Sequence, residues 1–574
     1  MSIAEPVTWY REATRKVTSH DEVNKCLADL ERGKKRLRTM PIRQMIALAE
    51  ACLDGLVENA DDWVRAACEF KGLPFGTPLG SEDMANGPLA TARYLRLIIR
   101  SLSEIERDGA PQLPGGMYEG LDGKLRVQVM PAKGLFDTVA FSGFKAHVVQ
   151  QAGVDRNNLR DNLASYYRRG RQDEGIALVL GAGNVSSIPA TDAFTKIFQE
   201  GKAVLVKMNP VNEYVGPIFE RAFAPLIEAD LLRIVYGGAE VGSHALQHAL
   251  VDEAHITGSV FSHDAIVWGP PGPERERRKR ENDPLLKKPI TSELGNVSPW
   301  IVVPGPYSDA QLRFQAENLA SSILNNCSFN CVATKVVLTW RSWPQREKFV
   351  GYVQEVLRNQ APRKAYYPGA EDRFRKFTGG DPTGVPAGAL PWTFKGNVDP
   401  QEHPLYFDEE SFCPVTVETS LDAASEANFL RQAVEFANDR LFGTLGCTVM
   451  VHPSFRKDAA NEKVFQQALC DLRYGTIGVN YWSALSYAII TPPWGGHPGA
   501  TLQNPESGIG WVHNTYMFDR PEKTIFEGPI TLFPKPLWFP SNRAADKVTR
   551  QVVSLYHRPS LFKLGPMLLA ALRG

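Results

Sequence analysis

The chain has 574 residues, too many for one ordinary hydrophobic core, so we expect two or three domains. Apolar residues make up 43% and charged residues 22% of the chain, a composition that excludes an intrinsically disordered protein. Lys and Arg together number 64, as do Asp and Glu, so the balance of charge gives no support to a nucleic-acid partner.

The sequence contains no sign of an oxidising or membrane environment. Its eight cysteines are scattered, without the regular spacing of a disulfide scaffold. Residues 1–20 mix charged residues with Trp and lack the apolar run of a secretory signal. No window approaches the roughly 20 apolar residues that a membrane helix needs. We therefore expect a cytoplasmic protein.

The first part of the chain is typical of helices. Apolar residues recur at three- and four-residue spacing in 21–34, 42–59 and 91–107. From 115 to 154 the sequence changes to glycine-punctuated, β-branched runs such as 124–130, which predict strands.

A βαβ pattern begins after residue 175. Short apolar runs predict strands at 176–180, 203–207, 232–236 and 255–259, and the segments between them predict helices at 190–199, 215–229 and 241–250. Strands and helices that alternate at this spacing favour an α/β fold with a doubly wound open sheet.

The remaining sequence divides into three kinds of segment. The arginine-rich stretch 270–284 predicts a solvated surface loop, with a phosphate or membrane contact as the alternative. A second α/β segment extends from about 293 to 479. The tail from 521 is rich in Pro and aromatic residues and ends in an amphipathic segment, 560–574.

A carboxylate and a cysteine stand where an enzyme would need a base and a nucleophile. Glu293 ends an apolar strand in Glu-Leu-Gly-Asn-Val-Ser-Pro, and Cys331 ends the polar turn Asn-Cys-Ser-Phe-Asn-Cys. A thiol that attacks an aldehyde, and a carboxylate that activates water, would require this pair.

A glycine cluster follows the first strand of the βαβ region. Gly181-Ala-Gly-Asn-Val-Ser-Ser187 is similar to the dinucleotide fingerprint G-x-G-x-x-G, with Ser in place of the last Gly. Alone it is a weak indication of nucleotide binding.

An ordered series of motifs over roughly residues 175–515 resembles the aldehyde dehydrogenases. Besides Glu293 and Cys331, the series consists of Asn184, Lys207, Thr257-Gly258-Ser259, Glu409-Glu410-Ser-Phe412-Cys-Pro-Val, Leu441-Phe-Gly443, Gly475-Thr-Ile-Gly-Val-Asn480 and Pro493-Trp494-Gly-Gly496. The resemblance implies a Rossmann-type cofactor domain, an α/β catalytic domain and an oligomerisation β element. The corresponding division is 1–175 (helices and a strand segment of the cofactor domain), 176–292 (dinucleotide-binding core), 293–480 (catalytic domain) and 481–574 (return segment, oligomerisation strand and extension).

The resemblance also implies roles for these residues. Cys331 would be the nucleophile, Glu293 the base and Asn184 a donor to the oxyanion. For the cofactor, NAD or NADP, the implied contacts are Lys207, Gly258, Ser259, Glu410 and Phe412. The implied reaction is oxidation of an aldehyde to a carboxylic acid through a thiohemiacetal and a thioester, without a metal.

Two features leave the nucleophile and the cofactor open. The run after Cys331 is one residue shorter than the family pattern, so Cys327 stays a competitor. A zinc site at this cysteine pair is not expected, because no His or second pair lies at ligand spacing. Pro210 occupies the position where the family often has a Glu that binds the adenosine ribose, so NADP is not excluded.

The substrate and partners are expected from composition and resemblance. Tyr481, Trp482 and Trp494, with Tyr487 nearby, would surround the aldehyde, or would instead pack in an aromatic core. The aromatic residues and the apolar tail would suit an apolar aldehyde and a weak membrane-surface contact, but packing of the tail on a partner subunit is the favoured interpretation. A homodimer or homotetramer is implied by the resemblance.

Two other functions compete with aldehyde oxidation. An acylating enzyme would pass the acyl group between the cysteine and coenzyme A, but a thiol acceptor needs little help from a base, so Glu293 favours water. A binding protein on a decayed scaffold predicts the loss of Cys, Asn or Glu, and the sequence retains all three.

Overall fold

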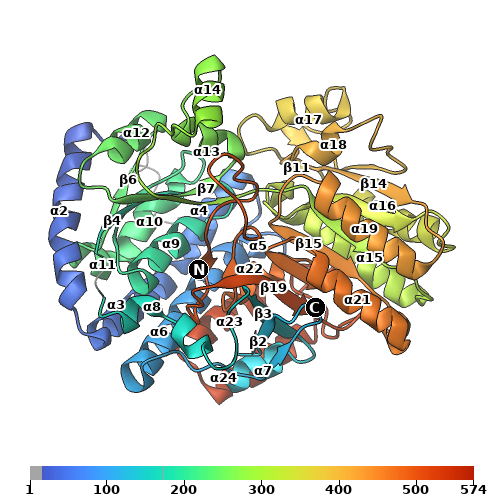
Figure 1. The fold of residues 1–574 in the computed structure, drawn as a ribbon, viewed down its shortest axis with the longest axis horizontal. Helices are drawn as coiled ribbons and strands as arrows, with labels where there is room; N and C mark the ends of the chain where they lie inside the picture. The colour runs from blue at the N-terminus through green and yellow to red at the C-terminus, as the bar shows by residue number, and fades with distance from the viewer. Residues whose placement is uncertain (1–15, 133, 172–173) are drawn as a thin grey trace, which may run out of the picture.

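The computed structural model describes residues 16–132, 134–171 and 174–574, which form two large β-sheets covered by helices (Figure 1) and two small two-stranded sheets. Residues 1–15 lie outside the described part, and with them most of the segment for which we expected no secretory signal.

The predicted βαβ region forms a five-stranded, fully parallel sheet in the order β6-β5-β4-β7-β8. Its strands are β4 (Ile176–Leu180), β5 (Ala203–Lys207), β6 (Leu232–Val235), β7 (Glu253–Gly258) and β8 (Ile290–Leu294). The four predicted strands are confirmed, each within two residues at either end. They are apolar on both faces because helices cover both faces.

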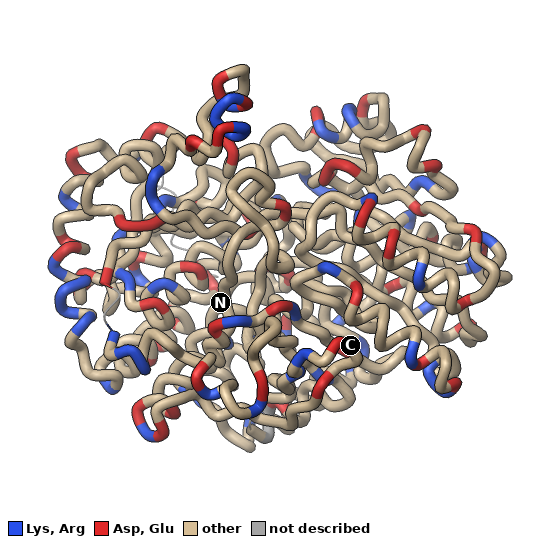
Figure 2. Tube along the Cα trace, in the orientation of Figure 1, with Lys and Arg blue, Asp and Glu red and all other residues tan. Residues whose placement is uncertain are grey.

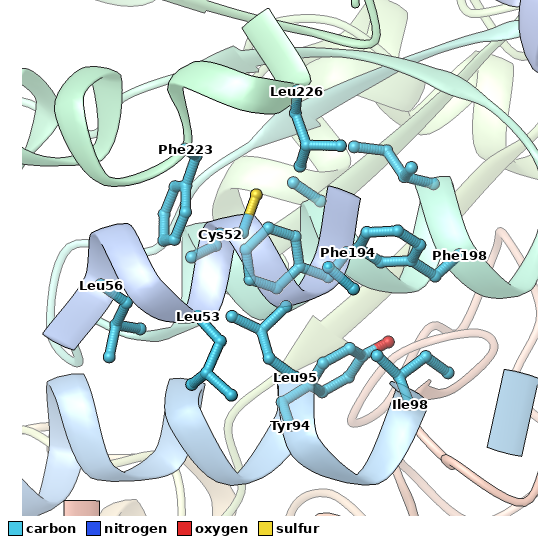
Figure 3. Packing of buried hydrophobic residues seen from close by; sticks show 14 of the residues in the cluster. Cys52, Leu53, Leu56, Tyr94, Leu95, Ile98, Phe194, Phe198, Phe223 and Leu226 are labelled. Atoms are coloured by element: carbon cyan, nitrogen blue, oxygen red, sulfur yellow. The ribbon is translucent and has the colours of Figure 1, made fainter. Parts of the chain in front are cut away.

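Alternate residues of these strands pack against different helices. Ala177 and Val179 face a core with α3 (Ile42–Glu58), α6 (Ala90–Asp108) and α9 (Ile188–Phe194), shown in Figure 3. Ile176 and Leu178 face α2 (His20–Thr39), α12 (Ala239–Gln247) and α13 (Val260–Val267). Each large apolar side chain buried in these layers contributes about 1.5–3 kcal/mol relative to exposure.

The second sheet has ten strands in the order β1-β2-β3-β19-β16-β15-β9-β10-β14-β13. Their bounds are β1 (Met117–Glu119), β2 (Leu125–Met130), β3 (Lys145–Gln150), β9 (Ser298–Val302), β10 (Thr334–Trp340), β13 (Thr393–Lys395), β14 (Val415–Leu421), β15 (Gly446–Met450), β16 (Thr476–Val479) and β19 (Pro521–Glu527). From the sequence we assigned the strand segment β1–β3 to the cofactor domain. In the structure these strands extend the ten-stranded sheet, because β3 pairs antiparallel with β19, which pairs parallel with β16.

Two pairs of helices cover the parallel part of this sheet, seen on the right of Figure 1. The helices α15 (Asp309–Leu324) and α16 (Arg346–Arg358) pack on one face with Trp300 and Val337. On the other face α19 (Glu426–Arg440) and α21 (Ala459–Asp471) pack with Ile301 and Val336. The remaining helices that position the site are α17 (Ala370–Thr378) and α18 (Leu405–Asp408).

The arginine-rich stretch expected as a loop contains a helix, α14 (Pro273–Glu281), which projects from the body (Figure 1). Pro273 opens the helix, and Arg277 pairs with Glu274 and Glu281 one turn away on either side. Blue and red lie side by side along it in Figure 2, and Arg278 and Lys279 also pair with nearby carboxylates.

The chain ends in two helices, α23 (Ala545–His557) and α24 (Leu561–Ala571). α23 packs against α6 and α3, and α24 packs on α23 through Met567 and Ala570. Among the described residues, no helix is long and apolar enough to cross a membrane.

Candidate active site

A cavity of about 1460 Å³ lies at the carboxyl ends of the five-stranded sheet. This edge is where open α/β sheets bind ligands. Its lining brings together all eight residues predicted for catalysis and cofactor binding: Asn184, Lys207, Gly258, Ser259, Glu293, Cys331, Glu410 and Phe412. They come from both sheets and lie far apart in sequence, so their convergence is a property of the tertiary structure.

The two candidate cysteines occupy different environments. After α15 ends, three successive residues, 326–328, have positive φ, and this turn separates Cys327 from Cys331. Cys331 is half-buried and lines the cavity. Cys327 is 3% exposed in the apolar core, and burial raises the pKa of its thiol to about 12. Cys331 is therefore the thiol that a ligand in the cavity would meet.

A network of hydrogen bonds holds the cysteine turn. Asn326 Nδ2 donates to the backbone oxygens of Asn184 (2.9 Å) and Phe329 (3.1 Å). Asn326 Oδ1 accepts from Tyr366 Oη at 2.9 Å and from Lys71 Nζ at 2.9 Å. The sequence analysis missed these roles. The signal was present in the Asn-rich turn, since Asn tolerates left-handed backbone better than most residues.

The side-chain amide of Asn184 uses one of its two hydrogens in a hydrogen bond within the protein. Its Nδ2 donates to Phe329 O at 3.0 Å, which fixes the plane of the amide beside the cysteine turn. An Asn amide carries two hydrogens, so the second remains for an oxyanion.

Glu293 lies at the end of β8 and is 4% exposed. Trp494 Nε1 donates to Glu293 Oε1 at 3.3 Å. Burial, and next the negative charge of Asp192, raise the pKa of Glu293 to about 8, while hydrogen bonds with Cys331 and Trp494 oppose the shift. The pKa of the Cys331 thiol is raised well above its usual value by burial and by Glu293 and Glu410. A carboxyl with a pKa near the working pH suits a general base.

The carboxylate of Glu410 packs against Gly295, and one of its two oxygens has no hydrogen-bond partner among the described residues. A Cβ at position 295 would come within 1.9 Å of Glu410 Oε2, so only Gly295 admits this carboxylate. Burial raises the pKa of Glu410 to about 8, against the opposing charge of Lys335. Glu410 Oε1 is buried without a hydrogen-bond partner in the structure, so it fits a ligand hydroxyl such as that of a ribose.

The three predicted substrate aromatics lie outside the cavity lining. Trp494 contacts Glu293, as described. Trp482 Nε1 donates to Val332 O at 2.7 Å and so supports the residue after Cys331. Tyr481 packs edge-on against Phe144 in an aromatic core, with ring centroids 4.8 Å apart. The aromatic rings that do line the cavity are those of Phe261, Tyr367, Phe412 and Phe442.

Comparison with known proteins defines the fold. No protein-family model and no curated protein matches the sequence. Among solved structures, NADP-dependent glyceraldehyde-3-phosphate dehydrogenase from Bacillus halodurans, complexed with NADP, is 17% identical with a TM-score of 0.58, covering 88% of this chain and 91% of its own. Indole-3-acetaldehyde dehydrogenase in complex with NAD+ is 18% identical with a TM-score of 0.57, covering 88% and 89%. NAD-dependent aldehyde dehydrogenase from Sinorhizobium meliloti is 16% identical with a TM-score of 0.58, covering 90% and 89%. The chain has the aldehyde dehydrogenase fold, and the predicted fold class is confirmed.

Proposed function

We propose that this protein oxidises an aldehyde to a carboxylic acid with NAD or NADP. The observation that carries the proposal is the convergence of Cys331, Glu293 and Asn184 in one cavity, with Glu410 facing the same space. Fold alone would not support an activity, since one fold hosts many functions. A thiol, a base and an oxyanion donor at one point are the groups that this reaction requires.

The chain's own residues would act in a fixed order. The Cys331 thiolate adds to the aldehyde carbon, and the second N–H of Asn184 stabilises the oxyanion of the thiohemiacetal. Loss of hydride from that carbon leaves a thioester on Cys331. Glu293 takes a proton from water, the water oxygen attacks the thioester, and the carboxylic acid leaves as the thiolate is restored.

A nicotinamide dinucleotide in the same cavity would supply the hydride acceptor. Lys207, Gly258 and Ser259 would hold its adenosine half, and Glu410 and Phe412 the other half. Every carboxylate among the described lining residues belongs to Glu293 or to residues 408–410, and none follows β5. A 2′-phosphate would therefore meet no like charge there, which supports acceptance of NADP as well as NAD.

In the acylating alternative, coenzyme A rather than water receives the acyl group from the cysteine. Retention of Glu293 favours water over coenzyme A, because a thiol needs little base assistance. The test is formation of reduced cofactor from an aldehyde panel, with NAD or NADP and with or without coenzyme A, for wild type and Cys331→Ala. Turnover without coenzyme A that Cys331→Ala abolishes supports the proposal, whereas turnover that demands coenzyme A supports the acylating reaction.

We also propose that α24 binds an anionic membrane surface. Its exposed apolar residues recur at helical spacing on the face away from α23: Leu561, Phe562, Leu568, Leu569 and Leu572, with Leu561 68% and Phe562 92% exposed. Residues 533–574 carry seven Lys or Arg and a single acidic residue, whereas the charges of the whole chain balance. Exposed Arg558 and Arg573 flank the helix. Apolar face and basic flanks together suit anionic headgroups.

Sedimentation with vesicles tests this surface. Vesicles of phosphatidylserine and phosphatidylcholine should carry the protein down, and pure phosphatidylcholine should carry less. Phe562→Ser with Leu569→Ser should abolish the binding, while Leu285→Ser, an exposed leucine elsewhere, should not. Absence of binding, with a molar mass that falls in the double variant, would instead make α24 a subunit interface.

A homodimer or homotetramer stays our proposal for the assembly. β19 already pairs with β3 on one side and β16 on the other, so the subunits would associate through another surface. Light scattering measures the assembly directly, and a single-subunit molar mass would refute it.

A further inference from the structure

A second cavity, of about 590 Å³, lies at the opposite edge of the five-stranded sheet from the active-site cavity. Its lining includes Thr291 at the start of β8 and Glu253 at the start of β7. Thr257 and Glu293, at the other ends of these strands, line the active-site cavity. The two strands therefore connect the two cavities.

Polar side chains fill the space between the cavities. Residues 253, 255 and 257 share one face of β7, and 291 and 293 share the same face of β8, because strand side chains alternate. Asp192, on α9, packs against this face and contacts both His255 and Thr257. We call Thr257, Asp192, His255 and Thr291 the polar file.

The contacts within the polar file are continuous. Thr257 Oγ1 donates to Asp192 Oδ2 at 2.9 Å. His255 Nε2 lies 3.4 Å from Asp192 Oδ2 and 3.3 Å from Thr257 Oγ1. On the other side of the ring, His255 Nδ1 lies 2.9 Å from Thr291 Oγ1. Asp192 is 1% and His255 2% exposed, so this chain of contacts runs through the interior.

Glu293 stands at the head of the polar file. It is the direct neighbour of Thr257 in the parallel pairing of β7 and β8, where strands lie about 4.8 Å apart. Asp192 is close enough for its charge to raise the pKa of Glu293. One water between Glu293 and Asp192 would complete the connection.

We propose that the polar file carries the proton that Glu293 takes from water to the second cavity. The inference rests on the proposed function, in which Glu293 must lose this proton before the next turnover. Cofactor and aldehyde in the active-site cavity would close that side to solvent. The Thr257 hydroxyl orients Asp192 by donating a hydrogen bond to Oδ2. Asp192 passes the proton to one nitrogen of His255, and the other nitrogen releases its proton through the Thr291 hydroxyl. The relay leaves His255 in its other neutral tautomer, and rotation of the ring between turnovers restores the first one. Every other group ends the cycle in its starting protonation state, so the net result is one proton moved.

The second cavity is suited to receive the proton. Carboxylates of Glu174, Glu200, Glu253 and Asp519 line it. Lys196 pairs with Glu200 at 2.8 Å and Glu253 at 2.9 Å, and its charge lowers the pKa of Glu253 against the effect of burial. The cavity thus offers carboxylate acceptors at the end of the file.

The experiment uses Thr257→Val and His255→Gln in the full-length protein. Rapid mixing with aldehyde and cofactor should give a first-turnover burst of reduced cofactor like that of wild type, because thioester formation does not use the file. Steady-state turnover should fall at least tenfold, proton release to an indicator dye should lag behind the burst, and the solvent deuterium isotope effect should rise. Thr257→Ser, which restores the hydroxyl, should restore all three readouts.

The controls separate the possible failures. Thr549→Val removes an equally buried hydroxyl from α23, far from the file, and should change nothing. Thr291→Val, at the second cavity, gives the same test if the first two variants do not fold. If the variants show a normal burst, and their turnover and isotope effect equal those of wild type, the proton-transfer role of the file is wrong, whereas the proposed aldehyde oxidation stands. A wild-type enzyme that forms no reduced cofactor with any aldehyde overturns the proposed function, and the file with it.

Discussion

Replacing Glu293 by Gln isolates the step in which water attacks the thioester. Gln keeps the shape of the side chain and can still accept the hydrogen bond from Trp494, but it cannot take a proton. General-base catalysis contributes about 10²–10⁴-fold, so turnover should fall by that factor. In the wild-type enzyme, the rate of thioester hydrolysis should depend on pH through the ionisation of Glu293. With a pKa of about 8, Glu293 is ionised in about one molecule in ten at pH 7, so hydrolysis should rise about tenfold as the pH increases past 9.

A stopped-flow assay reads the two stages separately. Glu293→Gln should release one equivalent of reduced cofactor per site and then stall, and its slow turnover should lose the rise through pH 8. Asp192, Cys331 and Glu410 all influence this titration, so the apparent pKa belongs to the group of acids. Glu347→Gln, an exposed residue on α16, should behave as wild type. Full turnover without a burst in Glu293→Gln would refute the role of Glu293 as base.

Three further variants test the site and the fold. Cys331→Ala should abolish thioester formation, detected by mass spectrometry of quenched enzyme, whereas Cys327→Ala should retain it; the reverse would reassign the nucleophile. Gly295→Ala should displace the carboxylate packed over it and weaken cofactor binding about 10- to 100-fold in a fluorescence titration, as loss of a charged hydrogen bond does, while Gly351→Ala in open space should not. Phe194→Ala should lower the free energy of unfolding in urea by about 3–5 kcal/mol, and a loss below 1 kcal/mol would contradict the packing in Figure 3.

Much of the fold could be predicted from local patterns. The strands at 176–180 and 203–207 and the helices at 42–59 and 91–107 agree with β4, β5, α3 and α6 to within a residue or so. Apolar periodicity identifies such elements because burial of one face or both is what makes them stable. The helix at 273–281 was missed because its stability comes from paired surface charges, which leave no apolar pattern.

The sequence by itself identified the candidate catalytic residues, since Glu293, Cys331 and Asn184 stand in a recognisable order along the chain. Tertiary structure alone decided which cysteine meets the cavity, because a left-handed turn of three residues turns Cys327 into the core and leaves Cys331 at the surface of the cavity. It also decided that β1–β3 join the ten-stranded sheet and that Tyr481 packs in the interior. Strand pairing and burial join residues hundreds of positions apart, and no local spacing encodes them. The polar file has the same origin: His255 and Thr291 become neighbours only when β7 and β8 pair.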